Sequence, residues 1–167
     1  MTRKPYTSLI RSENISFNLI IDHIDYLYQF TDKYLDEAVA KGRSPYLFTQ
    51  AAYGKHLIIM AESDSTRASL NEALQSLIDG QALDQTDQDV LAGSKVLLYL
   101  RGGKKESLIG KAEGTTEIKS LLDNMNEEWK STDHQYDFPL YYLVTSLKNS
   151  EVLKYYYSFD FLLRNDI

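Results

Sequence analysis

The hydrophobic positions between residues 14 and 41 recur at spacings of three, four and seven. They are Ile20, Ile24, Leu27, Tyr34, Leu35 and Ala38. Such spacing places side chains on one face of a helix, with the acidic and amide residues between them on the other. Gly42 follows the last apolar turn, where a helix commonly ends. The pattern predicts one long helix over 14–41 that needs partners to cover its apolar stripe.

The rest of the chain predicts further helices joined by short polar loops. Their ranges are 45–61, 69–79, 86–101, 115–129, 138–147 and 152–163, with a short, less regular piece over 107–112. Two stretches also fit strands. The apolar run 57–61 is too short for periodicity to decide, and the aromatic residues of 155–163 alternate. Because the other segments read as helical, we expect an all-α fold: a single compact domain over 1–167 with about seven helices.

Composition narrows the class of protein. The 167 residues are 43% hydrophobic and 25% charged, which is ordinary for a globular domain. No apolar run approaches the ~20 residues of a membrane-spanning helix, and no apolar stretch follows the basic N-terminus as in a signal peptide. There is no cysteine, which excludes disulfides and thiolate metal sites. We therefore expect a cytoplasmic protein without a membrane partner.

The formal net charge of −6 is distributed unevenly. Residues 62–94 contain seven acids and one base, residues 95–119 contain six bases and three acids, and residues 120–137 contain five acids and one base. Two acidic blocks thus flank a basic one. A general nucleic-acid binder shows the opposite balance, so no nucleic-acid partner is predicted.

Motifs for catalysis or for cofactor binding are missing from the sequence. Glutamate never stands three residues before a histidine, as it does in two-iron helical bundles. The stretch that begins at Gly102-Gly103-Lys104 resembles part of a phosphate-binding loop, but position 98 is leucine where the motif requires glycine. Asp133, His134 and Asp137 are best explained as a solvated polar loop. The sequence therefore predicts no enzyme, no metal and no cofactor.

Two remaining features favour a protein-binding function: the acidic stretch 62–94 and the 13 tyrosines. Acidic surfaces steer association with basic partners, and tyrosine is common at interfaces. We hypothesise a non-catalytic immunity or inhibitor protein that neutralises a toxin or nuclease-like partner by covering its basic cleft. The candidate contact residues are Asp79, Asp84, Asp87, Asp89, Asp123, Glu127, Glu128, Trp129, Tyr155 and Tyr156.

Two alternatives stay open at the level of sequence. One is a helical adaptor or homodimer that packs its aromatic C-terminal segment against a second copy. The other is an enzyme whose site is assembled from dispersed residues, with His23, Asp25, His56, His134 and the tyrosines as candidates.

Overall fold

The computed structural model describes residues 6–21, 32–147, 149 and 151–156. These residues form six strands and four helices, with 45% strand and 32% helix, and the sheet is mostly antiparallel. The prediction of an all-α fold with about seven helices is therefore wrong.

The elements follow one another as a mixed α and β chain. They are β1 (Tyr6–Ile20), α2 (Asp32–Ala40), β2 (Tyr46–Ser63), α3 (Arg67–Ile78), α4 (Gln85–Ala92), β3 (Ser94–Arg101), β4 (Ser107–Glu113), α5 (Thr115–Lys130), β5 (Phe138–Ser146) and β6 (Val152–Tyr156). The strand order is β4-β3-β2-β5-β6, and β1 also pairs with β2. The chain divides into two compact units: unit 1 contains Met1–Ser16 and Gly54–Phe138, and unit 2 contains Phe17–Tyr53 and Pro139–Ile167.

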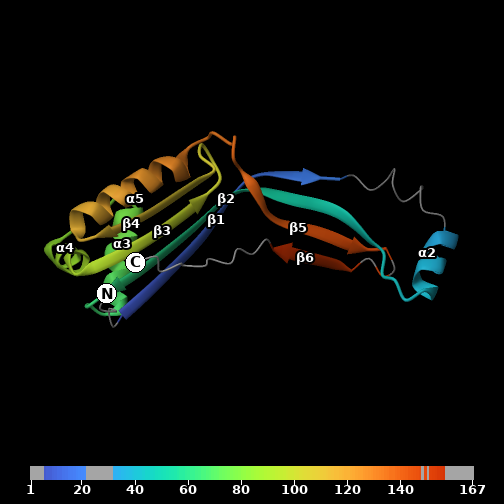
Figure 1. The fold of residues 1–167 in the computed structure, drawn as a ribbon, viewed down its shortest axis with the longest axis horizontal. Helices are drawn as coiled ribbons and strands as arrows, with labels where there is room; N and C mark the ends of the chain where they lie inside the picture. The colour runs from blue at the N-terminus through green and yellow to red at the C-terminus, as the bar shows by residue number, and fades with distance from the viewer. Residues whose placement is uncertain (1–5, 22–31, 148, 150, 157–167) are drawn as a thin grey trace, which may run out of the picture. The chain divides into compact units, whose positions relative to one another are not determined.

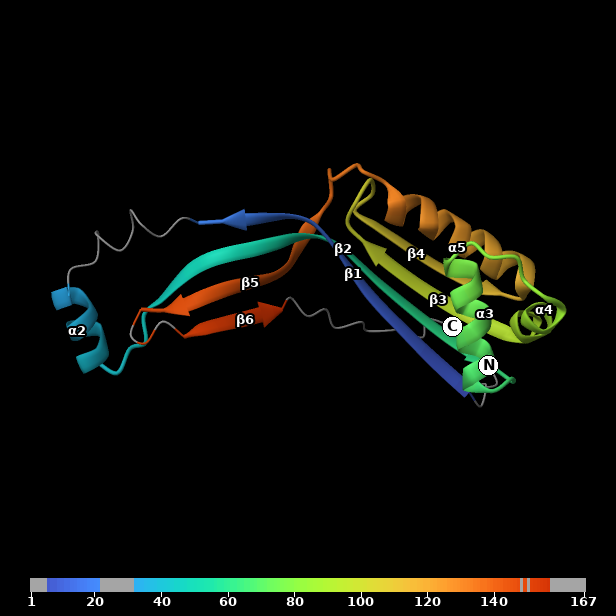
Figure 2. The ribbon, with the colours of Figure 1, turned by 180° about the vertical axis from the view of Figure 1, so that it is seen from behind.

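Unit 1 is a sheet covered by helices on one face. Helices α3, α4 and α5 lie together over this face (Figures 1 and 2). Alternate residues of β3 point into the layer, so Val96, Leu98 and Leu100 are buried while Leu97 and Tyr99 face the other side. They join the buried leucines of α3 and α5 in one hydrophobic core.

The close approach of α5 to β4 depends on a glycine. A Cβ atom on Gly110 would collide with Cδ1 of Leu121, so the lack of a side chain at this position leaves the room that the Leu121 side chain occupies. Strand β4 is the last strand at its side of the sheet.

Unit 2 contains a sheet of four strand segments, with α2 beyond the strand ends (Figure 1). The backbone N–H of Ile21 donates to the carbonyl of Thr49 at 3.0 Å, and the N–H of Leu147 donates to the carbonyl of Pro45 at 3.0 Å. In the described part of unit 2, the buried residues are few and mostly small: Thr49, Ala51, Ala52, Leu140 and Ser146. No described helix covers either face of these strands.

Most of the predicted helices are strands, for a common physical reason. Residues 46–61 lie in β2, 107–112 in β4, 138–146 in β5 and 152–156 in β6, and the helix predicted over 86–101 ends at Ala92 and gives way to β3. Their aromatic and β-branched residues fit a pleated sheet better than a helix. The long helix predicted over 14–41 is wrong at 14–20, which belong to β1, where Ile15, Phe17 and Leu19 alternate. It is confirmed over 32–40, which form α2, and residues 22–31 lie outside the described residues.

Two other predicted helices are confirmed along most of their length. Helix α3 carries the buried stripe Leu70, Ala73, Leu74 and Leu77, although its N-cap is Thr66 rather than Ser69. Helix α5 buries Ile118, Leu122 and Met125. That residues 1–167 form a single domain stays a prediction.

Candidate functional site

A row of aromatic rings crosses three strands of unit 2. Phe48 of β2, Tyr142 of β5 and Tyr155 of β6 lie on one face, with ring centroids 6.1 Å apart for the first pair and 5.1 Å for the second. Tyr142 and Tyr155 are register partners, and their rings are stacked. Cross-strand contacts of this kind stabilise an antiparallel pair.

The opposite face of the same strands is also aromatic. Tyr141 and Tyr156 are register partners with ring centroids 5.9 Å apart. The Nζ atom of Lys154 lies over both rings, at 3.6 Å and 4.8 Å from their centroids. The ring of Phe17 stacks on Tyr53 at 5.0 Å. We call the strand residues 17–20, 46–53, 139–146 and 152–156 the aromatic sheet.

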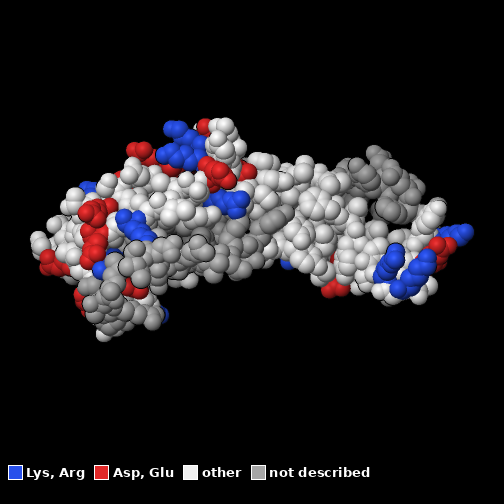
Figure 3. Space-filling view, in the orientation of Figure 1, with Lys and Arg blue, Asp and Glu red and all other residues white. Residues whose placement is uncertain are grey.

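The aromatic sheet is exposed and almost free of charge. Lys154 is its only charged residue. Its exposed large hydrophobic side chains are Phe17, Leu19, Ile20, Tyr46, Phe48, Val152, Tyr155 and Tyr156. In Figure 3 most of this part of unit 2 is uncharged on the visible face, and the charged side chains of unit 2 gather towards α2. Exposed apolar patches on this scale mark surfaces that bind a protein or a membrane.

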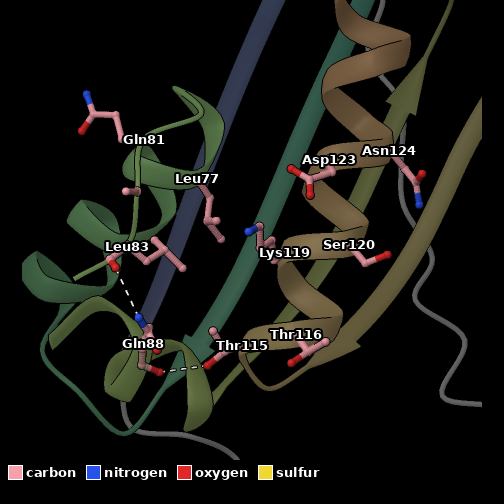
Figure 4. A pocket seen from close by; sticks show the side chains of 11 residues that line it. Leu77, Gln81, Leu83, Gln88, Thr115, Thr116, Lys119, Ser120, Asp123 and Asn124 are labelled. Atoms are coloured by element: carbon pink, nitrogen blue, oxygen red, sulfur yellow. Dashed lines mark hydrogen bonds between the residues drawn. The ribbon is translucent and has the colours of Figure 1, made fainter. Parts of the chain in front are cut away.

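Unit 1 has a groove between the α3–α4 pair and α5, with a volume of about 570 Å³. Leu77 and Leu83 form its apolar floor, and Lys119 and Asp123 reach over it from α5 (Figure 4). Ser120 and other polar side chains of α5 point away from this floor. The hydroxyl of Thr115 donates a hydrogen bond to the backbone carbonyl of Gln88. The polar groups therefore do not converge on a common ligand position, as they do in a specific small-molecule site.

The described histidines occupy different environments. Arg11 Nε donates to His56 Nε2 at 3.0 Å, so this imidazole is neutral and accepts at Nε2. Burial and then the Arg11 guanidinium lower the pKa of His56, and the nearby Glu13 carboxylate opposes them. His134 Nδ1 instead pairs with the carboxylate of Asp137 at 2.9 Å on an exposed loop. His23 and Asp25 lie outside the described residues.

Among the described residues, no group of three or more His, Asp or Glu side chains is arranged to hold a metal ion. That the chain has no catalytic, metal or cofactor site stays a prediction. In the part of the chain that the structure describes, none of the helices combines the length and the apolar character needed to cross a bilayer.

The acids of the α3–α4 region have local roles at the helix ends. Asp84 is the N-cap of α4 and accepts from the backbone N–H of Asp87 at 2.8 Å. Asp79 is the C-cap of α3, and its side chain accepts from Gln75. Asp89 accepts from the Gln85 side chain. An acid at a helix start is stabilising by itself, which accounts for Asp84, whereas Asp79 at the end of α3 and Asp89 within α4 are held by local side-chain hydrogen bonds. None of these contacts requires a partner protein.

The candidate residues of α5 are divided between core and surface. Trp129 packs against the core, and Glu128 is buried, with its Oε1 atom 3.2 Å from Lys105 Nζ. Asp123 and Glu127 are exposed. All of these residues and the four acids of α3–α4 belong to unit 1, whereas Tyr155 and Tyr156 belong to unit 2. That any of the ten candidates binds a partner stays a prediction.

The sequence reasoning missed the residues that complete the aromatic sheet. Phe17, Phe48 and Tyr53 come from β1 and β2, far in sequence from the C-terminal tyrosines that pointed to an exposed surface. The alternation of Ile15, Phe17 and Leu19 could have identified a strand there.

Comparison with known proteins gives a fold but no family. No family model and no curated protein matches the sequence. The structure is similar to pneumolysin (TM-score 0.63, 17% identity) and to listeriolysin O (TM-score 0.66, 16% identity). It is also similar to the cytotoxin suilysin from Streptococcus suis (TM-score 0.62, 17% identity). The likeness is one of fold.

The matches cover 89% of this chain but only 33%, 32% and 33% of the three toxins, so the chain spans about a third of their length. The neighbours are β-rich toxin structures, and the hypothesis of an all-helical immunity or inhibitor protein is therefore wrong. Neither alternative, the helical adaptor or the dispersed-site enzyme, gains support from these findings.

Proposed function

We propose that this chain is a toxin-related β-sheet domain that binds lipid membranes through the aromatic sheet of unit 2. The observation that carries the proposal is the exposure of aromatic and aliphatic side chains on strands whose only charged residue is Lys154. The similarity of the fold to toxins, including the cytotoxin suilysin, supports it.

The chemistry of the aromatic sheet suits the boundary between lipid and water. Tyrosine has an apolar ring and a polar hydroxyl, and its amphipathic ring sits at the level of the lipid headgroups in membrane proteins. The Lys154 stem can lie along the rings while its ammonium reaches a lipid phosphate. An interface with a charged protein would favour a rim of charged side chains, and these strands have none besides Lys154.

The expectation of no membrane partner rested on the absence of a long apolar helix. That criterion does not apply to strands, which expose side chains alternately on two faces. We retain the absence of catalysis as part of the proposal. The cytoplasmic location stays a prediction.

A tryptophan reporter tests the proposal directly. Trp129 is the only tryptophan, so Trp129→Phe combined with Tyr155→Trp places the single reporter in the aromatic sheet. On adding phosphatidylcholine–phosphatidylserine vesicles, we expect a blue shift of the emission and quenching by brominated lipids. Flotation with the vesicles measures binding independently.

A matched pair of variants tests whether vesicle binding depends on unit 2 or on unit 1. Ile20 of unit 2 and Ile109 of unit 1 both lie on strands and are 68% and 66% exposed. Burying an isoleucine side chain contributes about 1.5–3 kcal/mol, so Ile20→Asp should weaken vesicle binding by about tenfold or more. Ile109→Asp should leave it unchanged. Equal effects of both variants, or no flotation of the original chain, would contradict the proposal.

A further inference from the structure

Lys55 is a buried cation with an unusual set of partners. It lies on β2, and only 1% of the residue is exposed. Its Nζ atom donates to the backbone carbonyls of Glu128 at 3.0 Å, Trp129 at 3.2 Å and Ser131 at 2.5 Å. These carbonyls stand where α5 ends, so the ammonium serves as the C-terminal cap of the helix.

The arrangement balances a buried charge with backbone dipoles. The last carbonyls of a helix have no partners within the helix and carry partial negative charge. Burial of a charge is unfavourable unless it is compensated. Among the described residues Lys55 makes no ion pair with a carboxylate, so the three carbonyls hold it in place. Loss of the ammonium would take this donor from the carbonyls of Trp129 and Ser131, while the carbonyl of Glu128 would keep the N–H of Ser131, which donates to it at 3.3 Å.

The turn between β3 and β4 encloses the lysine side chain. A Cβ atom on Gly103 would lie 2.8 Å from Lys55 Cε, and one on Gly102 would lie 2.5 Å from the carbonyl oxygen of Gly54. Gly102 and Gly103 also have φ angles of 92° and 93°, which other residues rarely adopt. Glycine at both positions is therefore needed for the turn to close over Lys55.

The segment after α5 is attached to this same turn. The N–H of Tyr136 donates to the carbonyl of Gly103 at 2.9 Å, and the N–H of Gly103 donates to Asp137 Oδ1 at 3.0 Å. The end of α5 has a weaker outer contact, the ion pair between Lys105 and Glu128 Oε1. Glu128 Oε2 is buried without a hydrogen-bond partner among the described residues. Residues 128–137 are thus bound to the sheet by hydrogen bonds to Lys55 and Gly103, beside the packing of Trp129 against the core.

We propose that residues 128–137 form a conformational latch, a segment that opens as one unit, and that Lys55 holds it closed. With the ammonium on the three carbonyls, residues 128–137 are held against the sheet; with it withdrawn, they open together while the core remains closed. The fully buried core residues of α5, Ile118, Leu122 and Met125, all precede this segment and stay in the core, whereas Trp129, which is partly buried against the core, opens with the segment. The latch is a local opening unit, and it stands independently of the membrane function proposed above.

Hydrogen exchange in the absence of lipid tests the latch. Lys55→Met keeps the length of the side chain and removes its charge. A hydrogen bond from a charged donor contributes enough for exchange of the amides in 128–137 to rise about tenfold or more. The amides of β3 should keep their exchange rates. Trp129, whose carbonyl accepts from Lys55, should show red-shifted fluorescence emission and stronger quenching by acrylamide.

The control variant is Leu74→Ala, which removes buried volume from α3 without touching Lys55. It should speed exchange across unit 1 and leave the ratio between 128–137 and β3 as in the original chain. If Lys55→Met produces the same uniform pattern, or does not change 128–137, the latch is overturned.

If Lys55→Met does not fold, hydrogen exchange of the unaltered chain tests whether residues 128–137 open as one unit. The amides of Gly103 and Tyr136 belong to opposite sides of the contact and should share one opening free energy, giving protection factors that agree within about tenfold. A larger difference would show that the segment does not open as one unit and would overturn the proposal. Because no lipid is present, failure here is distinct from failure of membrane binding.

Discussion

Units 1 and 2 build their sheets from the same strands β1 and β2 but stabilise them in different ways. In unit 1, three helices cover one face, and the core is formed by aliphatic side chains such as Leu98 and Leu74. In the described part of unit 2, no helix covers the strands, and aromatic pairs such as Tyr142–Tyr155 hold neighbouring strands. β2 carries Leu57, Ile59 and Ala61 into the core of unit 1 but presents Tyr46 and Phe48 in unit 2.

Hydrophobic surface has a different role in each of the two units. Apolar area that is buried within unit 1 contributes to folding. Apolar area that stays exposed in unit 2 contributes little to folding and remains available to a partner. We therefore expect substitutions in unit 1 to change stability and substitutions in unit 2 to change binding.

The largest effect on stability should come from the core of unit 1. Leu98 is fully buried on β3, and Leu98→Ala should lower the free energy of unfolding by about 2–5 kcal/mol, because it removes apolar contacts and leaves a cavity. Urea unfolding followed by Trp129 fluorescence measures the change. The same replacement at Leu9, which is 68% exposed, should cost less than about 0.5 kcal/mol. Similar losses at both positions would remove the distinction between core and surface.

A smaller loss is expected where α5 approaches β4. Gly110→Ala places a methyl group against Leu121 and should destabilise unit 1 by about 1–3 kcal/mol through overpacking. Gly93→Ala is the control, since its nearest contacts would be at 3.9 Å. Thermal unfolding of the two variants compares them. A neutral Gly110→Ala would mean that the Leu121 side chain, or α5 with it, can move aside at little cost.

In unit 2, Tyr155→Ala should have a modest effect. The stacked pair with Tyr142 contributes about 0.5–1.5 kcal/mol, and the loss should appear as faster amide exchange in β5 and β6. Exchange in β3 of unit 1 should be unaffected. Tyr34→Ala, at an exposed position of α2, is the control for removal of a tyrosine alone. A loss as large as that of Leu98→Ala would show that the aromatic sheet is a folding core.

The smallest expected effect is a pH dependence confined to unit 1. The pKa of His56 is lowered from its ordinary value of 6.5, so the unfolded chain takes up the proton first as the pH falls. The stabilising contribution of neutral His56 is thus fully present above about pH 6.5 and is lost as the pH falls from there through the lowered pKa. Exchange in β1 and β2 near Arg11 should accelerate over this window. The variant His56→Gln should remove the dependence, and the described strands of unit 2, which contain no histidine, should not show it.

The candidate site could be predicted only in part. The sequence showed an excess of tyrosine and identified Tyr155 and Tyr156 as surface residues, and both are exposed. It could not show that Phe48 and Tyr142 lie beside them, because these contacts join strands that are far apart in the chain. Nor could it show that Lys55 is buried, because its carbonyl partners are 73 or more residues away.

The sequence by itself determined the helices α3 and α5. Helical hydrogen bonds join residues four apart, so a stripe such as Leu70, Ala73 and Leu74 identifies the helix from local spacing alone. Only the tertiary structure decided that 46–61 and 138–146 are strands, since the hydrogen bonds of a strand are made to distant segments. It also decided which apolar residues form a core and which stay exposed. A strand with alternating apolar residues has the same sequence pattern in both cases, and the residues are buried only where helices cover that face of the sheet.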